Sequence, residues 1–302
     1  MNFRELTYVI AIAKYQSVTL AAQKLYVSQP TLSKFVQRLE KELGQPLFRR
    51  LGNKFLLTYA GERYVEKASF ILLQKKQLDQ ELSDIKKENI GDLRVAFPVS
   101  RSTYILPCTL PAFHKQFPLV NVKVHEADSS TLENFILSGE IDLAFFNLPI
   151  ICTDIDYEII SREELVLIMS PDHPLASKGI YLNGCKYPWM DIKLLKNERF
   201  ILQTPNQRAR QIADKVFKES AIDPNIVLCT QSIIASVELA ISGYGICFAT
   251  ELQLNHIKTD VQPVRFSIGY PSAVTSFVAA FRKGIYLPYH TRAFIEIVRS
   301  FT

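Results

Sequence analysis

A proline-free segment, residues 58–88, carries apolar side chains at heptad spacing. This spacing predicts one long helix, about 45 Å in length at 1.5 Å per residue, with an apolar seam along one side. The seam must be buried, either against the helix's own domain or against the same helix of a second chain. The helix divides the 302 residues into a short amino-terminal part and a longer carboxyl-terminal part.

The amino-terminal part is basic. Residues 1–60 hold nine Lys or Arg and three Asp or Glu, an excess of six, whereas the whole chain carries a net charge of +5. The positive charge therefore belongs to this end, which suggests a polyanionic partner, with nucleic acid as the first candidate. By charge count alone, a solvated basic face is an equally good explanation.

Three helices are predicted in this basic part. Asn2 and Glu5 form a capping box for a helix over residues 2–15, and Thr19 is the expected N-cap of a second, short helix. Ser28 is the expected N-cap of a third helix, with Pro30 tolerated in its first turn. One side of the third helix is apolar, and the other carries amides, hydroxyls and cations without an acidic residue.

Two short helices joined by a tight turn form a helix-turn-helix, which places its second helix in the major groove of DNA. A predicted hairpin over residues 47–57 has cations at its tip and would act as a wing along the DNA backbone or minor groove. The predicted DNA contacts are Gln29, Pro30, Thr31, Ser33, Lys34, Gln37, Arg38, Arg49, Arg50 and Lys54.

Residues 17–61 resemble the winged helix-turn-helix of LysR-type transcriptional regulators. The resemblance rests on Ala21-Ala22, Val27-Ser28-Gln29-Pro30, Leu32-Ser33, Leu39-Glu40, Leu47-Phe48 and Ala60-Gly61. It implies double-stranded DNA with an interrupted palindromic operator as partner, a homodimer that often forms a tetramer of two dimers, and RNA polymerase as a candidate partner.

Two recognition helices on one duplex require two-fold symmetry, so we expect the long helix to pair with its copy. The expected dimer contacts are Tyr64, Ala68, Ile71, Leu78, Leu82 and Ile85. The predicted domains are a DNA-binding domain over residues 1–58, a linker helix over residues 59–90 and a regulatory domain over residues 91–302.

Beyond residue 90, short apolar runs alternate with amphipathic stretches, which predicts a parallel, doubly wound α/β architecture. The expected strands are residues 93–97, 120–125, 142–146, 165–169, 200–202, 226–229 and 245–249. Ligands of such sheets bind at the carboxyl ends of strands, against helix N-termini. Ser100, Ser102 and Thr103 stand at such a position, although any one of them could simply be an N-cap.

This region resembles the effector-binding domain of the LysR type, which is similar in fold to type 2 periplasmic binding proteins. The resemblance implies two subdomains, residues 91–162 with 266–302 and residues 163–265, crossed near residues 161–164 and 264–267. It also implies a small-molecule effector between them. The expected contacts are Ser100, Arg101, Ser102, Thr103, Ser129, Phe146, Asn147, Gln203 and Thr204.

Arg101 and Arg208 both lie near predicted helix starts, where they could fix a carboxylate or another small organic anion. Each could also be a solvated surface residue.

Other classes of function find little support. The five histidines lack metal-ligand spacing, and no nucleophile elbow or phosphate-binding loop is present, so we expect no enzyme, no metal and no cofactor. The five cysteines lie in apolar runs, and residues 202–207 contain none, which disfavours peroxide sensing. A solute-binding protein without DNA contact is the remaining alternative. We expect a cytoplasmic protein without a membrane span, because the apolar stretch near the amino terminus is too short for a signal peptide.

Overall fold

The computed structural model describes residues 2–52, 54–86, 90–269 and 272–302. The chain forms two compact units, residues 1–88 and residues 89–302. None of the helices within these described ranges is long and apolar enough to cross a membrane. Each unit has its own hydrophobic core.

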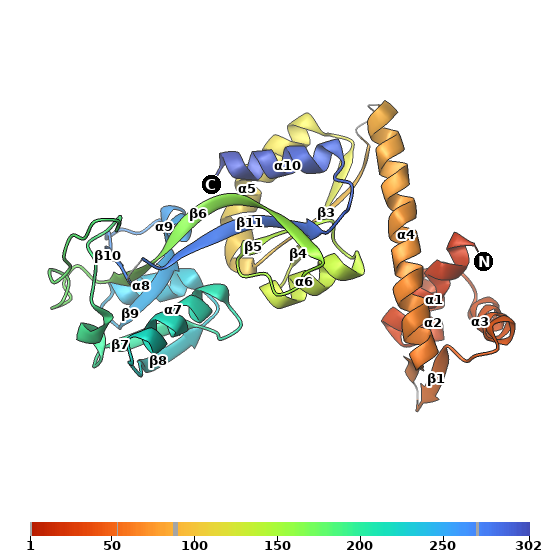
Figure 1. The fold of residues 1–302 in the computed structure, drawn as a ribbon, viewed down its shortest axis with the longest axis horizontal. Coiled ribbons are helices and arrows are strands. Elements are labelled where there is room, and N and C mark those ends of the chain that lie inside the picture. The colour runs from red at the N-terminus through yellow and green to blue at the C-terminus, as the bar shows by residue number, and fades with distance from the viewer. Residues whose placement is uncertain (1, 53, 87–89, 270–271) are drawn as a thin grey trace. The chain divides into compact units, whose positions relative to one another are not determined.

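The amino-terminal unit holds three helices, a two-stranded hairpin and a long helix (Figure 1). These are α1 (Phe3–Tyr15), α2 (Val18–Lys24), α3 (Gln29–Leu43), β1 (Phe48–Leu51), β2 (Lys54–Leu57) and α4 (Tyr59–Lys86). The capping box of Asn2 with Glu5 and the Ser28 N-cap are confirmed. The N-cap of α2 differs from the prediction: the side chain of Ser17, not Thr19, accepts from the Leu20 amide at 3.3 Å, so α2 begins at Val18.

The core of this unit lies between α1, α2, α3 and the hairpin. Leu32 and Val36 of α3 pack against Ile12 of α1 and Ala21 of α2, and all four are at most 4% exposed. The two small side chains of α2, Ala21 and Ala22, allow α2 to approach its neighbours closely. The apolar side of α3 is therefore occupied, and its polar side is left outward.

The apolar seam of the long helix α4 is covered within this unit along only part of its length. Its amino-terminal half packs along α1, where Tyr64 contacts the core of the unit and Ala68 is 2% exposed. Further along, Leu78 and Leu82 are 56% and 49% exposed. The side chain of Ile85 lies outside the described part of the structure. Tyr64 and Ala68 are thus packed against the helix's own unit, whereas Leu78 and Leu82 remain free for contact with a second copy.

The carboxyl-terminal unit is built on a nine-stranded sheet in the order β4-β3-β5-β11-β6-β9-β7-β8, with β10 beside β6. The strands are β3 (Gly91–Phe97), β4 (Val120–Glu126), β5 (Leu143–Asn147), β6 (Ile155–Met169), β7 (Arg199–Gln203), β8 (Asn225–Thr230), β9 (Ile246–Thr250), β10 (Val264–Ser267) and β11 (Val274–Arg282). The helices are α5 (Val99–Gln116), α6 (Ser129–Ser138), η1 (Ile192–Leu195), α7 (Arg208–Glu219), α8 (Ile233–Ile241), α9 (Glu251–Asn255) and α10 (Tyr289–Ser300).

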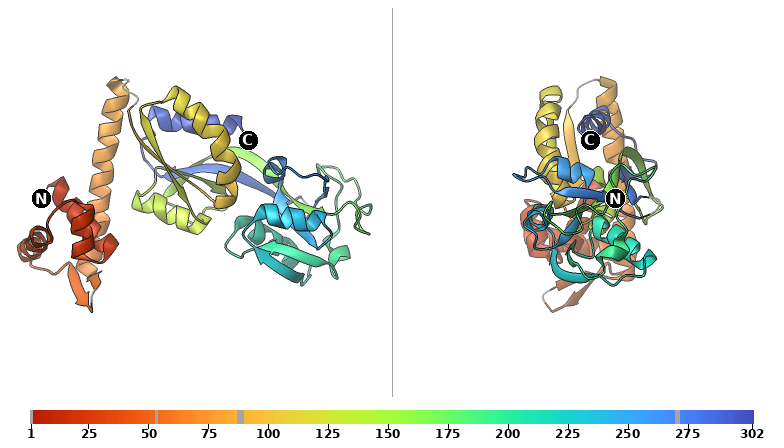
Figure 2. Two further views of the ribbon diagram at one scale, coloured as in Figure 1. Left: turned by 180° about the vertical axis from the view of Figure 1, so that it is seen from behind. Right: turned by 90° about the vertical axis from the view of Figure 1, so that its left-hand side faces the viewer.

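The sheet is mixed rather than parallel throughout. β3 pairs in parallel with β4 and β5, and β7 with β8 and β9, whereas β6 and β11 run antiparallel to their neighbours. Residues 155–164 of β6 pair with β11, and residues 165–169 pair with β9 and β10. The chain thus crosses between two subdomains within β6 and again at the start of β11 (Figure 2). The second crossing lies beyond residues 264–267, because β10 pairs inside the second subdomain.

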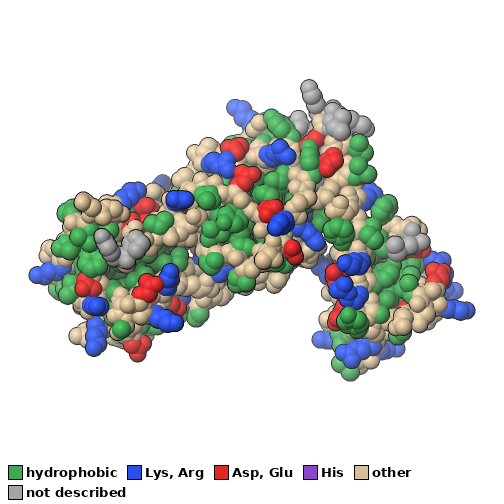
Figure 3. Space-filling model, in the orientation of Figure 1, with side chains coloured by type: hydrophobic (Ala, Val, Ile, Leu, Met, Phe, Trp, Pro, Cys, Tyr) green, Lys and Arg blue, Asp and Glu red, His purple; other side chains and the backbone are tan. Residues whose placement is uncertain are grey.

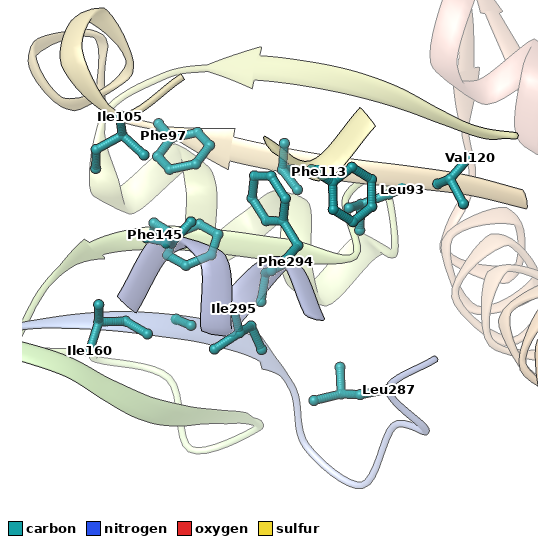
Figure 4. Packing of buried hydrophobic residues seen from close by; sticks show 14 of the residues in the cluster. Leu93, Phe97, Ile105, Phe113, Val120, Phe145, Ile160, Leu287, Phe294 and Ile295 are labelled. Atoms are coloured by element: carbon teal, nitrogen blue, oxygen red, sulfur yellow. The ribbon is translucent and has the colours of Figure 1, made fainter. Parts of the chain in front are cut away.

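Side chains alternate between the two faces of each half of the sheet. In the first subdomain, Phe97 and Phe145 point toward α5 and α10, where Phe113 and Phe294 complete the cluster (Figure 4). The next residue, Phe146, points to the opposite face and packs with α6. In the second subdomain α7 covers one face and α8 the other. This layering brings several helix N-termini to the junction of the subdomains.

Candidate DNA-binding surface and effector cavity

The polar side of α3 is open to solvent. Gln29, Pro30 and Thr31 are exposed in its first turn, and Lys34 and Gln37 are exposed further along. Ser33 is half-buried and accepts a hydrogen bond from Gln29 Nε2 at 3.1 Å. The amides and hydroxyls that could contact base edges are therefore not covered by the unit itself.

Arg38 differs from its neighbours on this side of α3. Its Nη2 donates to Glu5 Oε1 at 2.9 Å, and its Nε lies 3.6 Å from Glu42 Oε1. The guanidinium also lies over the Phe35 ring, 5.9 Å from the centroid. Because two carboxylates already partner it, Arg38 is a weaker candidate for DNA contact than the sequence suggested.

The hairpin carries the remaining cations. Arg49 and Arg50 on β1 and Lys54 on β2 are exposed, and Arg50 lies 5.9 Å from the centroid of the Phe55 ring. Figure 3 shows Lys and Arg side chains over α3 and around this wing. Helix and wing together offer a basic surface of the kind that contacts phosphates on both sides of a groove.

A cavity of about 490 Å³ lies at the junction of the two subdomains in the carboxyl-terminal unit. It is lined from the amino-terminal ends of α5, α6, α7 and α8 and from the carboxyl ends of β7 and β9. Its volume falls in the range of small-molecule sites. More than half of the lining residues have uncharged polar side chains, and apolar atoms form the larger part of the exposed wall.

Six of the nine residues expected to contact an effector line this cavity, namely Ser100, Arg101, Thr103, Ser129, Asn147 and Gln203. The other three do not. Phe146 is fully buried in the core against α6, because side chains alternate along β5. Ser102 Oγ donates to the Val99 carbonyl at 2.9 Å and to Glu126, and Thr204 Oγ1 is paired with Asn206 Oδ1 at 2.7 Å.

Several lining residues were not among the expected effector contacts. They are Asp128, Asn206, Gln207, Gln231, Ser232, Thr250, Gln253 and Thr275. The strand-end rule, applied to residues 226–229 and 245–249, could have found Gln231, Ser232 and Thr250. No sequence signal pointed to Thr275, which lies on a strand that was not predicted.

Arg101 is not free to bind a carboxylate. Its side chain is 3% exposed and forms an ion pair with Glu163 on β6. Nη1 also donates to Tyr104 Oη and Nη2 to Asn147 Oδ1, each at 2.6 Å, and the guanidinium lies 4.6 Å from the centroid of the Phe277 ring. Burial by itself would lower the pKa of Arg101, but Glu163 outweighs this effect and raises it. Arg101 therefore stays charged and joins α5 to β6 and β11.

Arg208 is also largely buried, so it is not a solvated surface residue. It begins α7, and its Nη2 donates to Glu133 Oε1 on α6 at 3.1 Å. The two side chains are 10% and 7% exposed. Nearby, a hydrogen bond from Ser130, another from the Thr131 amide and one from Asn206 lower the pKa of Asp128, so this lining carboxylate is ionised at neutral pH.

The cysteines and histidines show no assembled redox or metal site within the described ranges. All five cysteines are free thiols, and burial raises the pKa of Cys247 well above its usual range. No group of three or more His, Cys, Asp or Glu side chains among the described residues could hold a metal ion.

Sequence comparisons match both units to described domains. Residues 3–62 match the model of the bacterial regulatory helix-turn-helix protein, lysR family, and residues 86–302 match that of the LysR substrate binding domain. The chain is 29% identical to the uncharacterized HTH-type transcriptional regulator YcgK of Bacillus subtilis, over 99% of this chain and 94% of that protein. It is also 29% identical to the Hca operon transcriptional activator HcaR of Escherichia coli, over 99% and 98%.

Solved structures give the same fold. Full-length OxyR from Pseudomonas aeruginosa superposes with a TM-score of 0.75 at 24% identity, covering 100% of this chain and 94% of that one. Full-length CbnR, complexed with its target DNA, superposes with a TM-score of 0.61 at 24% identity, covering 100% of both chains. A winged helix-turn-helix, a linker helix and a two-subdomain α/β domain are thereby confirmed as the fold.

Proposed function

Because the chain belongs to the LysR family of DNA-binding transcriptional regulators, we propose that it recognises an interrupted palindromic operator as a homodimer or a tetramer of two dimers. We propose further that it responds to a small organic anion bound between its regulatory subdomains. The observation that carries the DNA-binding part is the outward polar side of α3, which bears amides, hydroxyls and cations, with Glu42 beside Arg38 near the end of the helix. The protein acts through binding and not as an enzyme.

The proposed DNA contacts divide into two groups by chemistry. Gln29, Pro30, Thr31, Ser33, Lys34 and Gln37 on α3 would enter the major groove, where amides can pair with base edges. Arg49, Arg50 and Lys54 on the wing would contact phosphates, which adds affinity without sequence preference. Arg38 is the weakest of the proposed contacts, because its guanidinium already forms ion pairs with Glu5 and Glu42.

The proposed effector site is the cavity at the subdomain junction. It is supported by the convergence of four helix N-termini and by the hydroxyl and amide groups of Ser100, Thr103, Ser129, Asn147 and Gln203 on its wall. Occupation of the cavity would shift the subdomains between two arrangements, provided that the ligand binds them with different affinity.

Gln29→Ala is expected to relax sequence discrimination and leave much of the nonspecific affinity, because it removes an amide and no charge. A good bidentate base contact is worth about 1–3 kcal/mol of discrimination. Duplexes selected from a random pool by the full-length protein would be compared with single-base variants by fluorescence anisotropy. The matched control is Gln74→Ala, an exposed glutamine on α4. Unchanged discrimination in Gln29→Ala would remove this residue from the reading surface.

A further inference from the structure

An ion pair joins the two subdomains at the cavity. Glu133 lies on α6 in the first subdomain, and Arg208 begins α7 in the second. Both side chains are at least nine-tenths buried, and Arg208 itself lines the cavity. Charges that have lost their hydration in this way depend strongly on their partners, so whatever competes for Arg208 also acts on the contact between the subdomains.

Glu133 does not depend on Arg208 alone. Its second carboxylate oxygen, Oε2, accepts hydrogen bonds from the backbone amides of Ile151 at 3.1 Å and Cys152 at 3.3 Å. If Arg208 turned away, Glu133 would keep these two donors. Separation of the pair therefore would not strand a bare carboxylate in the protein interior.

Arg208 is only partly satisfied. Nη1 donates to Gln211 Oε1 at 2.8 Å and Nη2 to Glu133, whereas the buried Nε has no partner. Burial lowers the pKa of Arg208, and the attraction of Glu133 and Asp128 does not fully offset that effect. Moreover, no side chain caps the N-terminus of α7. A further anion beside this guanidinium would be stabilised by both features.

Gln203, at the end of β7, complements Arg208 on the same cavity wall. Its Nε2 donates to the Phe248 carbonyl at 3.0 Å, which leaves the buried Oε1 without a partner. An unpaired buried acceptor is costly, and a ligand that brings an O–H or N–H to it regains that cost. A ligand that satisfies both groups must carry an acceptor for Arg208 Nε and a donor for Gln203 Oε1.

We propose that the Glu133 carboxylate occupies the position on Arg208 that the effector's carboxylate takes, and that the effector is a small hydroxy acid. The hydroxyl group of that acid donates to Gln203 Oε1. The exchange moves the cation from a bond between subdomains to a bond with the ligand, and so releases one link across the cavity. This inference rests on the proposed effector cavity.

The test uses the full-length protein and matched sets of probes: lactate, propionate and lactamide, and mandelate, phenylacetate and mandelamide. Thermal shift identifies the acid that stabilises the wild type, and calorimetry measures its affinity. At least one hydroxy acid is expected to bind, with its deoxy acid weaker by roughly tenfold and its amide weaker still. Absence of any stabilising acid, or equal binding of the amide, overturns the proposal.

Glu133→Gln gives the sharpest readout. It removes the competing charge and keeps a carbonyl for the Ile151 and Cys152 amides. Because the ligand then no longer has to displace a charged hydrogen bond between Glu133 and Arg208, the acid is expected to bind about tenfold more tightly. A purely structural role for Glu133 predicts weaker or unchanged binding. Asp214→Asn, which removes the partner of Arg210 on α7 outside the cavity lining, is the matched control and should leave affinity unchanged.

Arg208→Gln is expected to lose the acid, whereas Lys215→Gln, an exposed position on the same helix, is expected to keep it. If Arg208→Gln does not fold, Arg208→Lys replaces it and is expected to weaken binding, because it lacks the planar fork. Binding that is lost in Ser100→Ala but unaffected by changes at Glu133 and Arg208 would overturn the exchange and keep the cavity as effector site. Binding that is insensitive to all three changes would reject the proposed cavity as well.

Discussion

Arg101→Met is expected to lower the free energy of unfolding of the carboxyl-terminal unit by about 3–5 kcal/mol, the usual effect of removing one member of a buried ion pair. The substitution leaves Glu163, 3% exposed, without its cation, and it removes the donor to Asn147 Oδ1. The contact between the guanidinium and the Phe277 ring is lost as well. Because these partners come from α5, β5, β6 and β11, one side chain supports four elements at the subdomain junction.

Trp189 is the single tryptophan of the chain and lies in this unit, so its fluorescence reports urea unfolding there. The double variant Arg101→Met/Glu163→Gln should recover most of the loss, since it leaves no unpaired buried charge. Lys123→Met, which breaks an exposed pair with Asp92, should cost less than about 1 kcal/mol. A loss below about 1 kcal/mol in Arg101→Met would contradict a stabilising role for the pair.

The double variant Leu78→Asp/Leu82→Asp is expected to convert the assembly to monomers and to weaken operator binding by about 10²–10⁴-fold. Both side chains are about half exposed on α4, at positions where the heptad pattern predicts contact with a second copy. A dimer places two recognition helices on one duplex, and the second helix then binds at high effective concentration. Two carboxylates facing their copies across a two-fold axis would repel each other.

Analytical ultracentrifugation of the full-length protein gives the oligomeric state, and anisotropy gives the affinity. Gln74→Asp, an exposed change on the same helix at a position that is not a predicted dimer contact, should leave both unchanged. A variant that remains dimeric would show that other surfaces hold the copies together. Because Tyr64 and Ala68 serve the fold of their own unit, they are unsuitable for this test.

The sequence predicted the amino-terminal unit well because its signals are local. Asn2 and Glu5 are three positions apart, as are Ser28 and Thr31, so caps of this kind can be recognised from neighbouring residues in the sequence. The prediction of Thr19 as the N-cap of α2 was wrong because Ser17 carries a hydroxyl two residues earlier. Both are good N-caps, and only packing of Val18 and Ala21 decides between them.

The carboxyl-terminal unit was predicted in outline, and the first crossing lies near the expected residues 161–164, but the first half of β6 and the whole of β11 were not among the predicted strands. The first part of β6 alternates apolar with charged residues, and Glu163 is buried only because Arg101 meets it. Glu133 and Arg208 are likewise separated by 75 positions along the chain, and their pairing has no local signature. Phe146 was misassigned because a shift of one residue along a strand reverses the face.

The most direct test of DNA binding by the amino-terminal unit is the salt dependence of operator affinity for the full-length protein. Anisotropy titrations between about 50 and 200 mM KCl compare the wild type with Arg49→Ala/Arg50→Ala/Lys54→Ala. If the wing contacts phosphates, the slope of log affinity against log salt should fall by about one for each cation removed. An unchanged slope in the triple variant would contradict the proposed DNA-binding surface.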